Sequence, residues 1–132
     1  MVVVVDRFEQ VPTLLAAERS VVLVSVDWSP WPPRSRQMLT ALEETRAAWS
    51  LSDGPVAFYD LWPENEAELK DWYDGLCRCY APRFELHGHG YGPLWWMARG
   101  EILECVSKPY ERTIETLQRR SAAVFGPAAS GA

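Results

Sequence analysis

The side chains in this sequence that suggest chemistry are two histidines, three cysteines and one serine between two arginines. His87 and His89 lie two residues apart in a segment rich in glycine and proline. Two histidines at this spacing can share a metal ion, but a structural zinc site needs more ligands, and Cys77 or Cys79 would have to fold back to supply them. We therefore predict an exposed loop here, without a metal ion or any other cofactor.

The cysteines do not form a recognisable redox motif. Cys77 and Cys79 are two residues apart, and on a helix this spacing turns them about 200° away from each other. They would then act independently. If the helix ended before Leu76, a strained disulfide between the two cysteines would be the alternative. Cys105 fits a position inside a strand, where it would pack. An odd count of three is atypical of a secreted disulfide framework, so we expect reduced thiols and a cytoplasmic location.

Composition limits the remaining classes of function. The 132 residues are 48% hydrophobic and carry 13 basic and 18 acidic side chains, for a net charge of −5. This charge disfavours binding to nucleic acid. The apolar run Val2–Val5 is cut off by Asp6, which makes it too short for a signal peptide or a membrane span. Seven tryptophans are many for this length, and we expect some of them to line a contact surface.

The first half of the chain alternates strands with helices. Apolar runs predict strands at Val2–Val5, Val21–Val26 and Val56–Asp60. Asp6 and Glu9 have the spacing of a capping box, and a short or broken helix is expected from Pro12 to about Glu18. A further helix follows the prolines at 30, 32 and 33, and another starts near Asn65 and continues to about Tyr80.

The second half of the chain predicts a hairpin and a final helix. Residues 81–92 have no periodicity and are expected to form a loop that Pro93 closes. Leu94–Ala98 and Ile102–Val106 are strand-like and separated by Arg99, Gly100 and Glu101, which is hairpin spacing. A helix is expected from Pro109 to about Ala122. The whole order is βαβαβα followed by ββα, an α/β fold with a central mixed sheet and helices on both faces.

This order, together with local sequence, resembles the thioredoxin family over nearly the whole chain. The stretch from Val22 to Trp31 is similar to the second strand of thioredoxins and the aromatic approach to their active site. Gly92-Pro93 is similar to the cis-proline segment, and Gly100-Glu101 to the hairpin turn. The resemblance implies a thioredoxin-like domain at residues 1–124, with a flexible tail at 125–132.

The resemblance fails at the residues that carry the family's chemistry. Where thioredoxins have Cys-Gly-Pro-Cys, this chain has Pro32-Pro33-Arg34-Ser35, so proline and serine occupy the two cysteine positions. The family's buried acid is also missing, because Val26 stands in its place and Asp27 follows one residue later. Thiol-disulfide exchange needs a thiolate, which neither proline nor serine provides. We therefore predict that the family's redox activity is absent.

What remains is a candidate recognition surface, which we call the notch. Its predicted members come from the start of the helix after the second strand and from the loop before Pro93. Aromatic side chains, with Trp95 as a further candidate, would form its walls, while the helix N-terminus with Arg34 and Arg36 would favour an anionic group. A cis-proline edge would pair with an extended segment of a protein or peptide partner. The notch comprises Trp31, Pro32, Arg34, Ser35, Tyr91, Gly92 and Pro93.

Two enzymatic alternatives stay open. One is a thiol function of Cys77 and Cys79, and the other is a glutathione-related activity in the notch, although the helical domain of glutathione transferases does not fit in this length. A histidine acting as base toward Ser35 is a weaker idea, because no third orienting residue can be identified. The leading hypothesis is a binding module without catalytic residues that interacts with neither nucleic acid nor membrane.

Overall fold

A computed structural model describes most of the predicted core. The described residues are 2–10, 12, 16–25, 32–46, 55–62, 94–106 and 108–125. The segments that contain the predicted third helix, the histidine loop, Cys77 and Cys79 lie outside the described residues. So does the predicted tail apart from Phe125, which is the last residue of a helix and packs in the core. None of the described helices is long and apolar enough to cross a membrane.

Five strands form one mixed sheet in the order β1-β3-β2-β4-β5. The first three strands in this order are parallel, and β4 and β5 are antiparallel to their neighbours. Parallel neighbours need a crossover connection, which α2 supplies between β2 and β3. The strands are β1 (Val2–Val5), β2 (Ser20–Val24), β3 (Ala57–Leu61), β4 (Leu94–Ala98) and β5 (Glu101–Val106).

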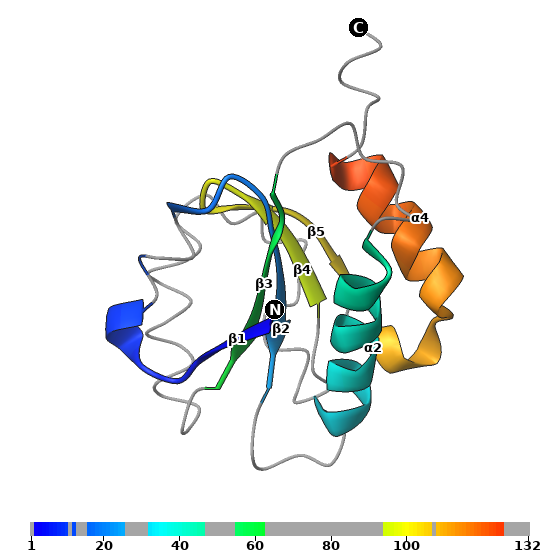
Figure 1. Cartoon of the computed structure of the whole chain (residues 1–132), viewed down its shortest axis with the longest axis horizontal. Helices are drawn as coiled ribbons and strands as arrows, with labels where there is room; N and C mark the ends of the chain where they lie inside the picture. The colour runs from blue at the N-terminus through cyan, green and yellow to red at the C-terminus, as the bar shows by residue number, and fades with distance from the viewer. Residues whose placement is uncertain are drawn as a thin grey trace, which may run out of the picture.

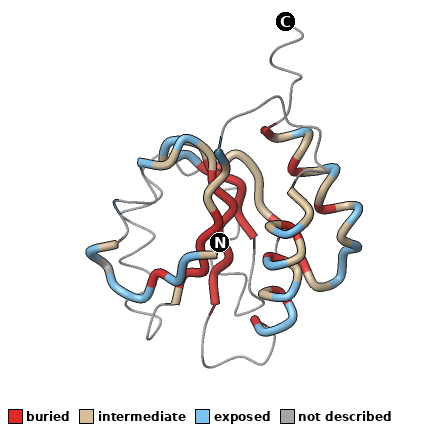
Figure 2. The backbone as a smooth tube through the Cα atoms, viewed as in Figure 1, coloured by how far each residue is buried: buried red, intermediate tan, exposed pale blue. Residues whose placement is uncertain are grey.

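The central strand β2 matches its sequence pattern closely. All five of its residues are buried, as expected for a continuous β-branched run that is covered on both faces. It is hydrogen-bonded between β3 and β4, and Figure 2 shows that these central strands are buried along most of their length. The predicted strands agree with the observed ones to within one or two residues.

The predicted hairpin is confirmed as a two-residue turn. Ala98 pairs with Glu101, and Arg99 and Gly100 between them have positive φ angles of 51° and 83°. Two central residues with positive φ give the turn twist that suits a hairpin. The pairing then skips Leu103, because Met97 faces Ile102 while Trp96 faces Glu104. This bulge gives β5 one extra residue.

Two helices, α2 (Pro32–Glu44) and α4 (Ile114–Phe125), cover one face of the sheet (Figure 1). A hydrogen bond of 2.8 Å from Nε2 of Gln118 to Oγ1 of Thr45 joins α4 to the end of α2. One hydrophobic core cluster lies between these helices and the sheet. Its buried members are Val21, Leu23, Leu39, Leu42, Phe58, Leu94, Trp96, Val106, Leu117 and Phe125.

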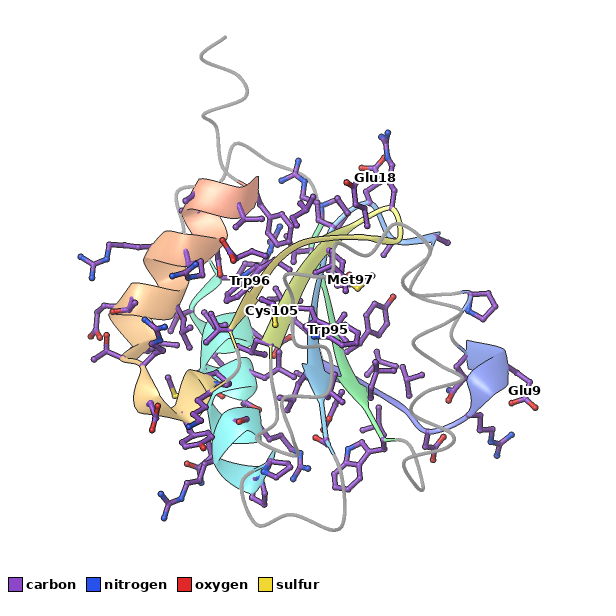
Figure 3. All side chains as sticks on the ribbon, turned by 180° about the vertical axis from the view of Figure 1, so that it is seen from behind. Glu9, Glu18, Trp95, Trp96, Met97 and Cys105 are labelled. Carbon is purple, nitrogen blue, oxygen red and sulfur yellow. The ribbon has the colours of Figure 1, made fainter. Side chains whose placement is uncertain are left out.

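Consecutive aromatic residues on β4 point to opposite faces of the sheet. Figure 3 shows Trp96 on the side of the two helices and Trp95 on the other side. Both side chains are fully buried. Nε1 of Trp96 donates to Oγ of Ser121 on α4 across 2.9 Å. Trp95 therefore does not form an exposed wall of the notch, contrary to the sequence-based expectation, since it belongs to a central strand.

The turn after β1 differs from its prediction. A short 3-10 helix covers Phe8–Gln10, and Oε1 of Gln10 accepts hydrogen bonds from the backbone N–H groups of Asp6 and Arg7 at 3.0 and 3.1 Å. In a capping box the residue reaching back would have been Glu9. The 3-10 helix begins at Phe8, so Arg7 is at the N-cap and Gln10 is the third helical residue, the position that reaches back in a capping box.

The last helix begins later and ends later than expected. Pro109 starts a separate 3-10 turn, Pro109–Glu111, and α4 begins only at Ile114. Oγ1 of Thr113 accepts a hydrogen bond from the N–H of Thr116 at 3.2 Å, which is an N-terminal cap that breaks the predicted continuous helix into two. The helix continues past Ala122 because Phe125, 7% exposed, packs into the core.

Candidate binding site at the start of α2

The described part of the notch is the first turn of α2. The helix begins at Pro32, a position that tolerates proline because the first N–H groups of a helix have no partner within it. Pro32 and Ser35 are buried, whereas Pro33 and Arg34 are exposed. The side chains of Pro32 and Ser35 therefore face inward, and Arg34 is the described notch residue that solvent reaches most freely. Trp31, Tyr91, Gly92 and Pro93 lie outside the described residues.

A buried carboxylate lies next to this turn, at the end of β3. Asp60 is 1% exposed. Its Oδ1 accepts a hydrogen bond of 2.5 Å from Oγ of Ser25, and its Oδ2 accepts one of 2.8 Å from Nε of Arg36. Nη2 of Arg36 also donates to Oγ of Ser25 at 3.2 Å. Both carboxylate oxygens are thus satisfied, which is the condition for keeping a carboxylate buried.

Trp62 completes this group, which we call the Asp60 cluster: Ser25, Arg36, Asp60 and Trp62. The guanidinium carbon of Arg36 lies 4.4 Å from the centre of a Trp62 ring, within the range of a cation–π interaction. The backbone N–H of Trp62 donates to the carbonyl of Val5 at 2.8 Å, and the backbone N–H of Ser25 donates to the carbonyl of Leu61 at 2.8 Å. The cluster therefore ties the ends of three parallel strands to α2.

The position of the cluster fits a general property of α/β folds. Ligands bind in such folds beside the carboxyl ends of parallel strands. Ser25 directly follows β2, and Asp60 is the fourth residue of β3. Ser25 itself is 0% exposed, so its hydroxyl is not accessible to a substrate. The cluster holds the start of α2 against the sheet, and it does not present a nucleophile to solvent.

Arg36 has a different role from the one that the sequence suggested. We expected Arg34 and Arg36 to attract an anionic group together. The Arg36 side chain is only 33% exposed and is paired with Asp60 inside the molecule. Its charge is consequently balanced by Asp60, whereas Arg34 in the first turn is exposed to solvent.

The charges on α2 run against the helix dipole. No acidic residue occurs in its first turn and no basic residue in its last, while Arg34 is near the start and Glu43 and Glu44 are at the end. Anionic side chains are normally favoured at the N-terminus and cationic ones at the C-terminus. Local preferences are broken most often where a surface serves binding, so this arrangement is consistent with a functional face.

A shallow depression of about 440 Å³ lies on the outer side of α2, next to the first turn. Its described lining combines small residues with longer ones. The described lining is Pro33, Arg36, Gln37, Thr40, Ala41 and Glu44.

The remaining sequence candidates divide into two groups. Cys105 lies on β5, where it is half-buried and faces Trp95. The next residue, Val106, packs into the core under α2 and α4, so Cys105 points to the opposite face of the sheet. His87, His89, Cys77 and Cys79 lie outside the described residues. Within the described ranges no three His, Cys, Asp or Glu side chains are grouped as metal ligands would be.

Sequence reasoning missed Asp60 as a site residue. The prediction looked for a buried acid at Val26 on the second strand, whereas the structure has one on β3. Two signals in the sequence pointed to it. Ser25 is the one polar residue in a run of apolar ones, and Asp60 is a charge inside another apolar run. Buried polar groups need partners, so two such exceptions on neighbouring strands can be expected to meet.

Comparisons with known proteins identify the fold. No family model and no curated protein matches the sequence. Among solved structures, human ERp44 in its zinc-bound form aligns with a TM-score of 0.59 and 12% identity, over 93% of this chain and 31% of that one. A mutant thioredoxin from Halobacterium salinarum aligns with a TM-score of 0.52 and 18% identity, over 94% of this chain and 90% of that one.

A designed protein gives a similar match, with a TM-score of 0.52 and 18% identity over 88% of this chain and 90% of the other. The chain thus spans about a third of the length of ERp44 and nearly all of the Halobacterium thioredoxin. Identities this low are evidence for the fold alone. Together with the mixed five-stranded sheet and its helices, they show that this chain has a thioredoxin-like α/β fold.

Proposed function

We propose that this chain is a redox-inactive thioredoxin-like binding module that recognises a protein or peptide partner through the notch. The observation that carries the proposal is the composition of the first turn of α2, Pro32-Pro33-Arg34-Ser35. In the thioredoxins that the sequence resembles, this turn carries both reactive cysteines. Disulfide exchange proceeds by attack of a thiolate on sulfur, and neither a proline ring nor a serine hydroxyl can take part.

The frame around this turn supports recognition without exchange. In the Asp60 cluster, two hydrogen bonds of Arg36 and its contact with the Trp62 ring fix the start of α2 to the ends of β2 and β3, and a third hydrogen bond joins Ser25 to Asp60. A pre-formed surface loses less conformational entropy on binding than one that must order itself. The notch residues Trp31, Tyr91, Gly92 and Pro93 would contact the partner, Arg34 would add a positive charge, and Pro32 and Ser35 would pack beneath them.

The position of Cys105 argues against a thiol function at this turn. Its side chain faces the side of the sheet opposite α2, so it cannot replace the missing sulfurs. A thiol enzyme would then depend on Cys77 and Cys79. An insulin-reduction assay on the wild type and on the Cys77→Ala/Cys79→Ala variant separates these possibilities. We expect both proteins to remain at the background rate.

Partner recognition is tested by affinity capture. The immobilised chain is compared with Trp31→Ala and Pro93→Ala, and Arg119→Ala, an exposed position on α4, is the matched control. Proteins that the wild type retains are identified, and their affinities for all four chains are measured with purified material. We expect both notch variants to weaken binding about tenfold or more and the α4 variant to leave it unchanged. Equal binding by Trp31→Ala, Pro93→Ala and the wild type would reject the notch.

A further inference from the structure

The edge strand β1 carries the two large apolar side chains that are exposed in the described part of the chain. Val3 is 45% exposed and Val4 is 51% exposed. Because consecutive strand residues point to opposite faces, β1 is open on both faces at this point (Figure 2). Natural edge strands are usually protected by a charged residue, a proline or a bulge, and Val2–Val5 contains none of these.

Within the described sheet, one side of the β1 backbone has no neighbouring strand. The carbonyl of Val5 accepts a hydrogen bond from the N–H of Trp62, so the backbone groups of Val5 face β3. Backbone groups alternate in direction along a strand, so those of Val3 face β3 as well, while those of Val2 and Val4 point away from the sheet. β1 is the outermost strand of the described sheet, with β3 as its partner there (Figure 1).

We propose that β1 pairs antiparallel with β1 of a second copy of this chain, with Val3 opposite Val3. A two-fold antiparallel pair requires some residue to face its own copy. Centring the pair on Val4 would oppose Val2 to Asp6, whose N–H already donates to Oε1 of Gln10. Centring it on Val3 opposes valine to valine at three successive positions and lets Val2 and Val4 exchange four backbone hydrogen bonds with the other copy.

Charge favours the same register. With Val3 at the centre, the Asp6 residues of the two copies are six residue steps apart, about 20 Å at the usual rise of a strand. This separation exceeds the Debye length of about 8 Å at physiological ionic strength, so these carboxylates hardly repel each other. The net charge of −5 on each copy still opposes association. The paired strands are short, so the dimer is weak and is favoured by higher protein and salt concentrations.

Sedimentation velocity on the full chain tests the pairing. Protein concentration is raised from about 10 µM to about 1 mM at low and high salt, so that mass action and screening both act on the equilibrium. We expect a monomer–dimer equilibrium that shifts toward the dimer with both variables. Val3→Lys should raise the dissociation constant about tenfold or more, although it lowers the net negative charge. Ala123→Lys, the same charge change at an exposed position of α4, should leave dimerisation unweakened.

Disulfide trapping tests the register. Val3→Cys and Val4→Cys are each made in a background with Cys77, Cys79 and Cys105 replaced by alanine. Residues opposite each other in a non-hydrogen-bonded pair have Cα atoms about 4.5 Å apart, within the range of a disulfide. Oxidation should therefore link two copies through Val3→Cys much faster than through Val4→Cys.

Three results would overturn the proposal. The first is a chain that stays monomeric at every concentration. This result counts against the proposal even if an added extended peptide binds at β1. The second is a dimer that Val3→Lys does not weaken. The third is trapping that is equally fast at the two positions, or faster through Val4→Cys.

Discussion

Nε of Arg36 donates a 2.8 Å hydrogen bond to Oδ2 of Asp60, which connects the start of α2 to the end of β3. The Asp60 side chain is 2% exposed, whereas that of Arg36 is 33% exposed. The pair lies directly beside the first turn of α2, the turn that we propose corresponds to the active-site turn of thioredoxins. An ion pair thus holds the start of α2, where the sequence reads Pro32-Pro33-Arg34-Ser35, against the end of β3.

The Arg36–Asp60 pair predicts energetic coupling. Arg36→Met would leave a buried carboxylate with Ser25 as its described partner, and we expect the free energy of unfolding to fall by about 2–4 kcal/mol. Asp60→Asn should also destabilise the protein, by about 1–3 kcal/mol. The double variant should lose clearly less than the sum of the two, because the second change removes a partner that the first has already lost. Urea denaturation of all four proteins measures the coupling, and additive losses would contradict it.

The hydrogen bond of the Trp96 indole predicts that replacing Ser121 destabilises the protein. Nε1 of Trp96 donates to Oγ of Ser121, which in turn donates to the carbonyl of Leu117 at 2.8 Å. Ser121→Ala would leave a buried N–H without this acceptor, so we expect a loss of about 1–3 kcal/mol in thermal or urea unfolding. In a Trp96→Phe background the same change should cost much less. Equal costs in both backgrounds would show that the hydrogen bond does not matter.

The burial of Tyr59 predicts that the stability of the folded protein falls at alkaline pH. It is 8% exposed, and burial raises its pKa above the ordinary value of 10.0. The unfolded chain therefore loses this proton first, at about pH 10.0, while the folded chain keeps it. The contribution to stability is complete below that pH and is lost as the pH rises toward the folded pKa. Urea unfolding between pH 8 and pH 11 should show a smaller loss of stability in Tyr59→Phe than in the wild type, and equal losses would refute the assignment.

The hairpin predicts a stabilising substitution. Arg99 has a positive φ of 51°, which costs free energy for a residue with a Cβ atom. Asparagine before glycine is favoured in this type of turn, so Arg99→Asn should raise the melting temperature through a gain of about 0.5–1 kcal/mol. The exposed ion pair of Arg99 with Glu18, at 3.8 Å, adds little to stability. Gly100→Ala is the opposing control and should destabilise the turn. A lower melting temperature for Arg99→Asn would contradict the argument.

The arrangement of strands could be predicted because local patterns and packing agree. The run Val21–Val24 is apolar throughout, and the structure buries it at the centre of the sheet. Leu94–Ala98 was predicted as a strand with the same limits that the structure gives it. Short runs rich in β-branched and aromatic residues and bounded by turn residues favour strands, and burial on both faces explains why these runs do not alternate with polar residues.

The predictions that were wrong concern details that depend on tertiary contacts or on where a helix begins. Phe125 extends α4 because it packs in the core eight residues after Leu117, whereas the prediction ended the apolar stripe at Leu117 because the buried position between them is a serine. Gln10 takes the role predicted for Glu9 because the 3-10 helix begins at Phe8, with Arg7 at its N-cap. Trp95 was expected to contribute to the surface because it follows Pro93, but it is buried by its place in β4. In each case a contact distant in sequence, or the residue at which a helix begins, decided the outcome.

The Asp60 cluster was the part of the site that sequence reasoning did not assemble. Ser25, Arg36 and Asp60 are separated by 11 and 24 residues along the chain. They meet because parallel strands bring their carboxyl ends to the same edge. A prediction that first placed β2 and β3 side by side, and then asked which polar groups end up buried, would have found them.

The central claim is that this thioredoxin-like frame has no thiol chemistry at the start of α2. Insulin reduction by the wild type and by Pro32→Cys/Ser35→Cys, with dithiothreitol as reductant, tests it most directly. We predict that the wild type stays at the rate of the reductant alone, whereas the double variant, which restores two cysteines at the family's spacing, exceeds that rate about tenfold or more. Catalysis by the wild type would contradict the account. An inactive double variant that is correctly folded would show that residues 32–35 do not occupy the thioredoxin active-site position.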